Sequence, residues 1–255
     1  MSADIAWVAR GDFCEPETVL PLPDNTLLVS NVCGFSKTGN GYLSLLNSKG
    51  EAIDWRIVDK LDAPLGMARV NDRLYIVDSN RLRILAWPSY TPITMIELGT
   101  TVANDVAVTA GGTAFVTDTA KHSVLKVAPD GSQTLLTATP QFQGANGIAL
   151  DDEYLLVGGE RLWQVDLKTN VVETLGPTWL TDIDGIEIEA NGTLQVTPVG
   201  GALIRYNRTD KSAEIYSGNG VSSANHGYSQ ALELALIPTG FDNTVIAIRV
   251  RAPAP

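Results

Sequence analysis

The chain repeats one pattern of apolar and polar positions along most of its length. In each copy, a segment in which apolar residues alternate with polar or small ones leads into a turn of Gly, Asn or Asp, and a second, mostly apolar segment follows. Alternation with a period of two residues is typical of a β-strand, and turn residues between two such segments indicate a hairpin. The copies lie at 16–31, 64–78, 103–118, 145–158 and 183–197.

The copies are regularly spaced. When Glu17, Leu65, Asn104, Asn146 and Asp184 are taken as equivalent, the spacings between them are 48, 39, 42 and 38 residues. A period of about 40 residues with several strands in each unit is typical of the blades of a β-propeller. Because 255 residues hold about six such units, we predict an all-β fold, a single six-bladed β-propeller domain over residues 1–255, with almost no helix.

The two ends of the chain are expected to complete the ring. Residues 4–9 alternate weakly and are predicted to pair with the last blade, because an open propeller would leave an unpaired strand edge. The sixth copy, at 232–250, is the least regular, and the position in it that corresponds to Glu17 is not identified. A long polar loop at 33–40, between the second and third strands of the first blade, is predicted to overhang a site.

Charge and hydropathy narrow the class of protein. The net charge of −11 argues against nucleic acid as a partner, because binding to phosphates needs a basic stripe, and none is visible. No apolar run approaches the ~20 residues that span a bilayer, and no secretory leader is visible, so we expect a cytoplasmic protein without membrane contact. Cys14 and Cys33 do not make a disulfide framework; they could pair, but we favour free thiols.

The equivalent positions of the copies predict a metal site. In a propeller they form a ring around the mouth of the central channel, which would bring together the oxygens of Glu17, Asn104, Asn146 and Asp184. Such an oxygen-only set suits Ca²⁺, whereas zinc and copper prefer His or Cys. The alternative is that Asn and Asp before Gly serve only as turn residues.

At this point the sequence resembles the regucalcin/gluconolactonase/paraoxonase-like six-bladed propellers over essentially its whole length. The resemblance is carried by 16–19, 28–31, 39–44, 63–67, 104–108, 146–148, 184–186 and 237–243.

The resemblance implies a divalent cation, usually Ca²⁺, at the mouth of the channel. Its ligands would be Glu17, Asn104, Asn146 and Asp184, with Glu15 as the alternative to Glu17. The implied activity is metal-assisted hydrolysis of a lactone or ester, with the metal polarising the carbonyl. Asp184 would be the candidate general base or nucleophile.

Two departures from the pattern of these propellers concern the substrate. Val102 stands where the members that hydrolyse sugar lactones carry an arginine, and His122 stands where they place a glutamate. A valine cannot bind a sugar hydroxyl, so the resemblance does not extend to an aldonolactone substrate.

Five further residues are candidates because of their predicted places on the face that carries the ring. His122 and His226, the only histidines, are candidate catalytic residues; exposed loop histidines are the alternative for both. Asn31 and Asp118, at strand ends, and Trp179, in a connection between blades, are candidate substrate-binding residues.

Three functions therefore remain open. The leading hypothesis is a Ca²⁺-dependent, or other divalent-metal-dependent, hydrolase of small lactones or esters. The second is a lyase, cyclase or isomerase of a carbonyl metabolite that uses the same metal. The third is a non-catalytic binding or scaffold propeller with a structural ion.

Overall fold

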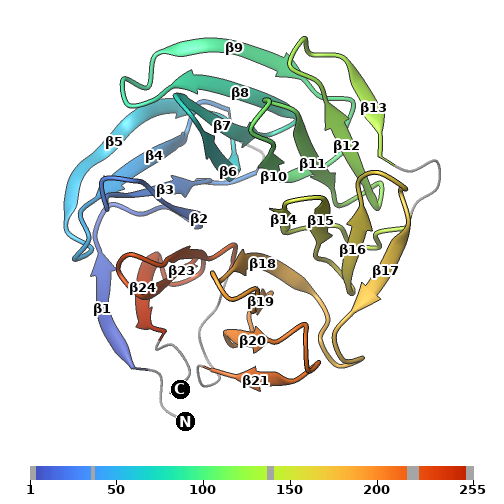
Figure 1. Ribbon diagram of the computed structural model, residues 1–255. Helices are drawn as coiled ribbons and strands as arrows, with labels where there is room; N and C mark the ends of the chain where they lie inside the picture. Colours follow the sequence, from blue (N-terminus) through green and yellow to red (C-terminus); the bar gives the residue numbers. More distant parts are fainter. Residues whose placement is uncertain (1–3, 36–37, 137–140, 217–223, 251–255) are drawn as a thin grey trace.

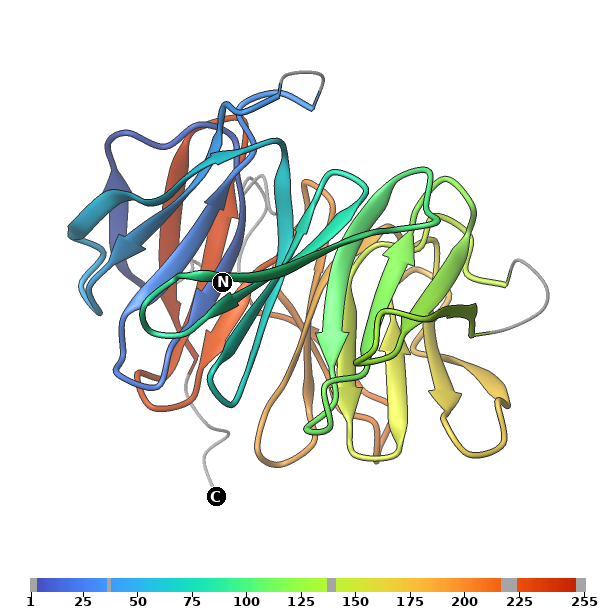
Figure 2. The same cartoon turned by 90° about the horizontal axis from the view of Figure 1, so that it is seen from above.

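The fold is a ring of sheets. The computed structural model describes residues 4–35, 38–136, 141–216 and 224–250. These residues form 24 strands in six four-stranded antiparallel sheets, and none of them is helical. The sheets are arranged around a common centre (Figure 1), and their strands run up and down when the molecule is turned by 90° (Figure 2). The predicted six-bladed β-propeller is confirmed.

Within the first five blades the strands follow chain order from the centre outwards. Blade one holds β2 (Pro16–Pro21), β3 (Leu27–Asn31), β4 (Gly41–Leu46) and β5 (Ala52–Leu61). Blade two holds β6 (Pro64–Val70), β7 (Arg73–Asp78), β8 (Arg81–Ala86) and β9 (Pro92–Glu97). Blade three holds β10 (Ala103–Val108), β11 (Ala114–Asp118), β12 (Ser123–Val127) and β13 (Gln133–Leu135). Blade four holds β14 (Ile148–Asp151), β15 (Tyr154–Val157), β16 (Leu162–Asp166) and β17 (Val172–Leu175), and blade five β18 (Ile183–Ile188), β19 (Leu194–Pro198), β20 (Ile204–Tyr206) and β21 (Ala213–Ile215).

The sixth blade is built from both ends of the chain. It holds β22 (Gly227–Ser229), β23 (Leu234–Thr239), β24 (Thr244–Arg249) and β1 (Ile5–Arg10). β1 is antiparallel to β24 and covers its outer edge, with Arg10 opposite Thr244. The predicted closure by the N-terminal segment is thus confirmed, and β24 is left with no unpaired edge.

Apolar side chains fill the spaces between neighbouring blades. Each second strand is buried on both faces, so successive residues serve two different interfaces. Leu27 of β3 packs toward the sixth blade, in a cluster with Leu236 and Val245, while the next residue, Leu28, packs toward the second blade with Leu74. This is why the second segment of each repeat reads as a continuous apolar run rather than as an alternation.

Antiparallel order fixes the direction of the inner strands. Since each blade runs from its inner to its outer strand and then passes to the next inner strand, the inner strands of all blades begin at the same end of the channel. The loops between second and third strands and the connections between blades lie at this end too. Among the described residues, no helix is long and apolar enough to cross a membrane.

Candidate functional site at the mouth of the channel

The ring positions coincide with irregularities in the inner strands. The register shifts between Pro16 and Val19 in β2, and the same shift occurs at the start of β6, β10 and β18. Such bulges turn a side chain out of the regular alternation across the sheet. The first residue inside each irregularity is the predicted ring residue of that blade: Glu17, Leu65, Asn104 and Asp184. Asn146 lies just before β14, where its N–H donates to the Gly158 carbonyl.

The structure places Ala224 at the sixth position of the ring, which sequence reasoning did not identify. The Ala224 carbonyl accepts from Thr197 Oγ1 at 3.2 Å, just as the Asn146 carbonyl accepts from Thr117 Oγ1 at 2.6 Å. The Ala224 N–H donates to the Pro238 carbonyl, as that of Asn146 donates to the Gly158 carbonyl. Asn225 is one residue further along and forms a parallel bridge with Thr18, the neighbour of Glu17. An alanine brings no ligand oxygen to the ring.

The two predicted amide ligands are oriented with their oxygens free. The Asn104 amide nitrogen donates to Thr119 Oγ1 at 3.2 Å, and Thr119 Oγ1 donates to the Ala145 carbonyl at 2.6 Å. The Asn146 side chain donates to the Asp184 carboxylate. In consequence Asn104 Oδ1, Asn146 Oδ1 and Asp184 Oδ1 are all buried and have no hydrogen-bond partner.

Carboxylates dominate the electrostatics of the ring. Burial raises the pKa of Glu17 well above its usual value, the nearby Asp184 and Asp105 raise it further, and a hydrogen bond from Thr18 Oγ1 at 2.6 Å opposes them. Burial, with Asp105 nearby, raises the pKa of Asp184 to about 7. Both shifts have the same cause, which is that negative charge gathers here with little water to solvate it.

The donor set fits a hard divalent cation. Buried oxygens without partners are costly to leave unsatisfied, and three of them belong to residues that the sequence predicts as ligands. Amide and carboxylate oxygens are what Ca²⁺ prefers. No group of three or more His, Cys, Asp and Glu side chains that could hold a metal occurs in the described part of the chain, so any ion here depends on the amides as well.

The glycines that follow ring residues serve close packing. A Cβ on Gly147 would lie 2.0 Å from the backbone oxygen of Asp184, and a Cβ on Gly185 would lie 2.5 Å from His226 Nδ1. Neither glycine has a positive φ, so neither is required by a left-handed turn. The Asn-Gly and Asp-Gly pairs therefore lie where neighbouring inner strands approach each other.

A second tier of polar groups lies below the ring. Asp105 accepts hydrogen bonds from the N–H groups of Val106 at 2.8 Å and Ile148 at 3.0 Å and from the Asn225 side chain, while burial raises its pKa to about 7. His226, one of the two histidines predicted as candidate catalytic residues, is 1% exposed. Its Nδ1 lies 2.9 Å from Thr197 Oγ1, and its Nε2 is buried without a partner. Burial lowers the pKa of His226 to about 3, so its imidazole is neutral at ordinary pH.

A pocket of about 380 Å³ opens above one side of the ring. Glu17 and Asp184 line it together with parts of the first, fifth and sixth blades. The remaining lining residues are Glu15, Pro16, Val32, Phe35, Val199, Gly200, Ala224, Gly240, Phe241 and Asn243. The predicted role of the 33–40 loop is partly met, because Phe35 lies over this pocket; residues 36–37 are outside the described residues.

Two of the predicted substrate-binding residues accept hydrogen bonds from backbone N–H groups through their side chains. Asn31 is fully buried, with its Oδ1 accepting from the Cys14 N–H at 3.1 Å and its amide nitrogen donating to Ser44 Oγ at 3.0 Å. Asp118 accepts from the N–H groups of Thr101 at 2.7 Å and Val102 at 3.1 Å. Both side chains thus fix the chain just before an inner strand, and contact of either with a substrate stays a prediction.

His122 and Trp179 lie away from the residues that line the pocket. His122 is exposed, and its Nδ1 accepts from the Gly144 N–H at 3.0 Å, which attaches the β11–β12 turn to the connection between the third and fourth blades. Trp179 is 53% exposed in the connection between β17 and β18. Their predicted catalytic and substrate-binding roles stay predictions, and the geometry gives His122 a structural contact.

The expectation of free thiols is wrong. Cys14 and Cys33 form a disulfide, with their Cα atoms 5.0 Å apart. The Cys33 N–H also donates to the Cys14 carbonyl at 3.2 Å, because the chain before β2 runs beside the chain after β3. The sequence alone could not show this proximity, which arises from the β2–β3 hairpin. Glu15, the fallback for Glu17, is exposed and accepts from the Gly34 N–H at 2.6 Å, so it belongs to the rim rather than to the ring.

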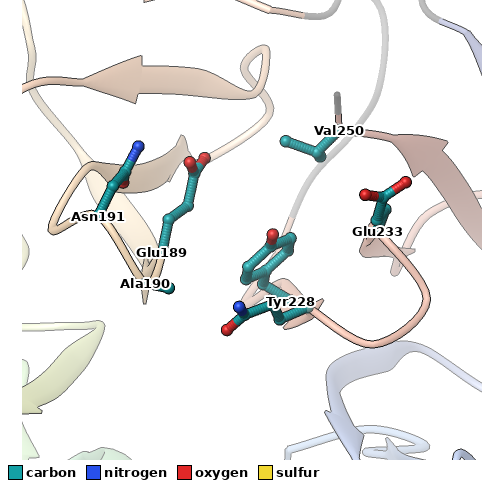
Figure 3. Close-up of a pocket in the computed structure, with 7 residues that line it drawn as sticks. Glu189, Ala190, Asn191, Tyr228, Glu233 and Val250 are labelled. Atoms are coloured by element: carbon teal, nitrogen blue, oxygen red, sulfur yellow. The ribbon is translucent and has the colours of Figure 1, made fainter. Parts of the chain in front are cut away.

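A second cavity, of about 200 Å³, lies between the fifth and sixth blades. Figure 3 shows Glu189, Tyr228 and Glu233 around it. Glu189 is already paired there, since its Oε1 accepts from Arg205 Nε at 2.7 Å and from Gln195 Nε2 at 3.0 Å. The cavity therefore borders a buried ion pair that joins the turn after β18 to β20, and none of its lining residues is a ring residue.

Comparisons with known proteins bear on the fold. No family model matches the chain, and no curated protein matches it in sequence. Among solved structures, it is similar to selenomethionine-substituted virginiamycin B lyase from Staphylococcus aureus, with a TM-score of 0.67, 11% identity and coverage of 96% of this chain and 99% of the other. A catalytically inactive form of that lyase with quinupristin has a TM-score of 0.66 and 12% identity, with 96% of this chain and 99% of the other covered. A streptogramin B lyase structure has a TM-score of 0.66 and 11% identity, with 96% of this chain and 98% of the other covered. At such identities the likeness shows a shared propeller fold, and membership of the regucalcin/gluconolactonase family is not confirmed.

Proposed function

We propose that this protein is a divalent-metal-dependent hydrolase that opens a lactone or an ester at the mouth of the channel. One observation carries the proposal: Asn104 Oδ1, Asn146 Oδ1 and Asp184 Oδ1, from three different blades, are buried without partners at ring positions. Two of the ring residues, Glu17 and Asp184, also line a pocket of about 380 Å³, a size that suits a small molecule.

The ion would be held by Glu17, Asn104, Asn146 and Asp184, and Ca²⁺ is the expected species because all four donors are hard oxygens. When bound, it would supply Lewis-acid polarisation of the substrate carbonyl. The resemblance of the sequence to regucalcin/gluconolactonase-like propellers supports this assignment, since it places the same residue types at these four positions.

The residues of the chain have separable roles in this proposal. Thr119 holds the Asn104 amide so that its oxygen faces the ring, and Asn146 does the same for one side of the Asp184 carboxylate. Asp184 lines the floor of the pocket and is the group best placed to accept a proton from an attacking water there. Val102, in place of an arginine, offers no hydrogen bond to a sugar hydroxyl.

A lyase, which would break the ester without adding water, is the second candidate. It is favoured by the likeness of the fold to virginiamycin B lyase. Product mass separates the two candidates, because hydrolysis adds the mass of water to a lactone, whereas elimination or isomerisation leaves its mass unchanged.

The first test is metal content and thermal melting of the purified protein before and after EDTA. We expect about one Ca²⁺ per chain, a melting temperature that falls in EDTA and recovers with added Ca²⁺, and turnover of some members of a lactone and ester panel. Binding of a ligand at 100 times its Kd stabilises a protein by about 2.7 kcal/mol, so the shift will be measurable.

Paired variants connect the activity to the ring. Asp184→Asn keeps the shape of the side chain but removes its charge, and it should abolish turnover and weaken Ca²⁺ binding. Asp182→Asn, at an exposed position in the connection before β18, is the matched control and should change neither. If the parent protein binds Ca²⁺ but consumes no substrate, and Asp184→Asn only lowers the melting temperature, the ring is structural and the hydrolase proposal is wrong.

A further inference from the structure

The pocket above the ring is asymmetric. Its described lining comes from the first, fifth and sixth blades, so a ligand in it approaches the ring from the side of Glu17 and Asp184. Three loops between second and third strands each place an exposed apolar side chain beside it. These are Phe35 (70% exposed), Val199 (59%) and Phe241 (93%). Large apolar side chains left in water around a pocket commonly mark a surface that a ligand covers.

The charges around the pocket are all of one sign. Its described lining includes the carboxylates of Glu15, Glu17 and Asp184 and contains no Lys, Arg or His. Away from an ion at the ring, a carboxylate, sulfate or phosphate on a ligand would find no positively charged side chain in this lining and would meet the Glu15 carboxylate at the rim. The pocket favours a ligand without negative charge, and its apolar rim favours one with a large apolar group.

The rim is held in place on both sides of Glu17. The Cys14–Cys33 disulfide and the bond from the Gly34 N–H to Glu15 Oε2 fix the chain that leads to Phe35. The Glu15 N–H donates to Asn243 Oδ1 at 2.7 Å, which attaches the start of the first blade to the loop of the sixth blade that carries Phe241. A rim that is ordered before binding loses less entropy when a ligand arrives.

We propose that the substrate is an uncharged lactone or ester whose alkyl or aryl group lies against Phe35, Val199 and Phe241 while its ester group reaches the ring at Glu17 and Asp184. This inference rests on the proposed function and adds the substrate class. It makes the three apolar rim residues determinants of specificity rather than participants in the bond-breaking step.

The test uses γ-lactones with short, medium and long alkyl side chains, together with the matching γ-lactams, which have the same shape but are not hydrolysed. For the parent protein with Ca²⁺, kcat/KM for the lactones and the calorimetric affinity for the lactams should both rise with chain length, by about tenfold across the series. A lactone whose chain ends in a carboxylate should be the poorest substrate.

Two variants test whether the apolar rim residues cause this dependence on chain length. Phe241→Ser should remove most of the dependence of kcat/KM and of lactam affinity on chain length. Ile215→Ser, which removes another exposed apolar side chain from the outer strand β21, is the control and should behave like the parent.

The lactams separate this inference from the proposed function. If lactams bind more tightly as the chain lengthens but no lactone is consumed, the substrate pocket stands and the hydrolase proposal fails. If lactones are consumed at rates that do not depend on chain length, or if Phe241→Ser keeps the full dependence, the inference is overturned. Absence of binding by every lactam would overturn it as well.

Discussion

At the scale of single residues, the two asparagines of the ring use their amide nitrogens in hydrogen bonds to the protein and leave their amide oxygens without a partner. Asn104 uses its amide nitrogen on Thr119, and Asn146 uses its own on Asp184, so in both cases the oxygen remains. A buried amide oxygen without a partner costs on the order of 1–3 kcal/mol, which is a large fraction of the stability of a typical protein. Two such oxygens and an unpartnered carboxylate oxygen are the groups that the proposed cation would satisfy.

Glu187 carries a testable consequence of the acidic channel. It lies on β18, three residues beyond Asp184, and its carboxylate accepts a hydrogen bond from the Tyr228 N–H of β22 and faces Asp105 of β10. Burial raises its pKa from 4.5 to about 8, because its hydrogen bond offsets only part of the loss of solvation. At neutral pH the folded protein thus keeps a proton on Glu187 that the unfolded chain has lost.

Stability should therefore fall as pH rises. A raised pKa in the folded state gives stability that is fully present below pH 4.5 and is lost as pH rises through about 8. In EDTA, the free energy of unfolding of the parent should decrease between these limits by up to about 1.4 kcal/mol per pH unit. Glu187→Gln, which cannot ionise, should flatten this slope, and Glu173→Gln on the outer strand β17 should not. Equal slopes for Glu187→Gln and the parent in urea unfolding would contradict the prediction.

At the scale of elements, the inner strand was predictable from sequence and its surroundings were not. Its pattern recurs in the first five blades, so the register that brings Glu17, Asn104, Asn146 and Asp184 to one end of the channel could be inferred directly from the sequence. The sixth position, Ala224, could not be identified because the strand that follows it, β22, has only three residues and shows no alternation that could fix a register.

The polar residues at strand ends show a second limit. Asn31 and Asp118 lie at the end of the channel that carries the ring, as predicted, but their side chains are used by backbone N–H groups just before β2 and β10. Asp78 does the same before β6, where it accepts from the Ala63 N–H at 2.8 Å. Sequence shows that a polar residue ends a strand; it does not show whether the partner is backbone or ligand.

The Cys14–Cys33 disulfide links the chain before β2 to the chain after β3. It closes a segment with a sequence separation of 19 residues, and loops of this length contribute about 3 kcal/mol through the unfolded state. The double variant Cys14→Ser, Cys33→Ser should lower the midpoint of urea unfolding accordingly and should weaken binding of long-chain lactams, because the Phe35 loop loses its attachment. The parent under reducing conditions should match the variant. An unchanged midpoint for both would show that the disulfide does not form in solution.

At the scale of the whole molecule, the ring depends on closure between the two ends of the chain. β1 covers the edge of β24, and the apolar cluster between the sixth and first blades includes Ala9 together with Leu27 of β3. Trp7 adds a contact to the first blade through its indole N–H, which donates to the Ser48 carbonyl at 3.2 Å. Since Thr18, the neighbour of Glu17, forms a parallel bridge with Asn225 across this junction, closure also sets the spacing of the ring positions of these two blades.

Removing β1 should therefore affect both stability and the site. A chain shortened to begin at Gly11 loses the strand, exposes the backbone edge of β24 and uncovers part of the cluster that contains Leu27. We expect a lower melting temperature, association through the free edge in light scattering, and a smaller gain in melting temperature on adding Ca²⁺. A chain shortened only to begin at Asp4 keeps β1 and should behave like the parent. If the chain beginning at Gly11 stays monomeric and gains as much from Ca²⁺ as the parent, closure by β1 is not what holds the ring together, and the six inner strands must fix its geometry by their mutual packing alone.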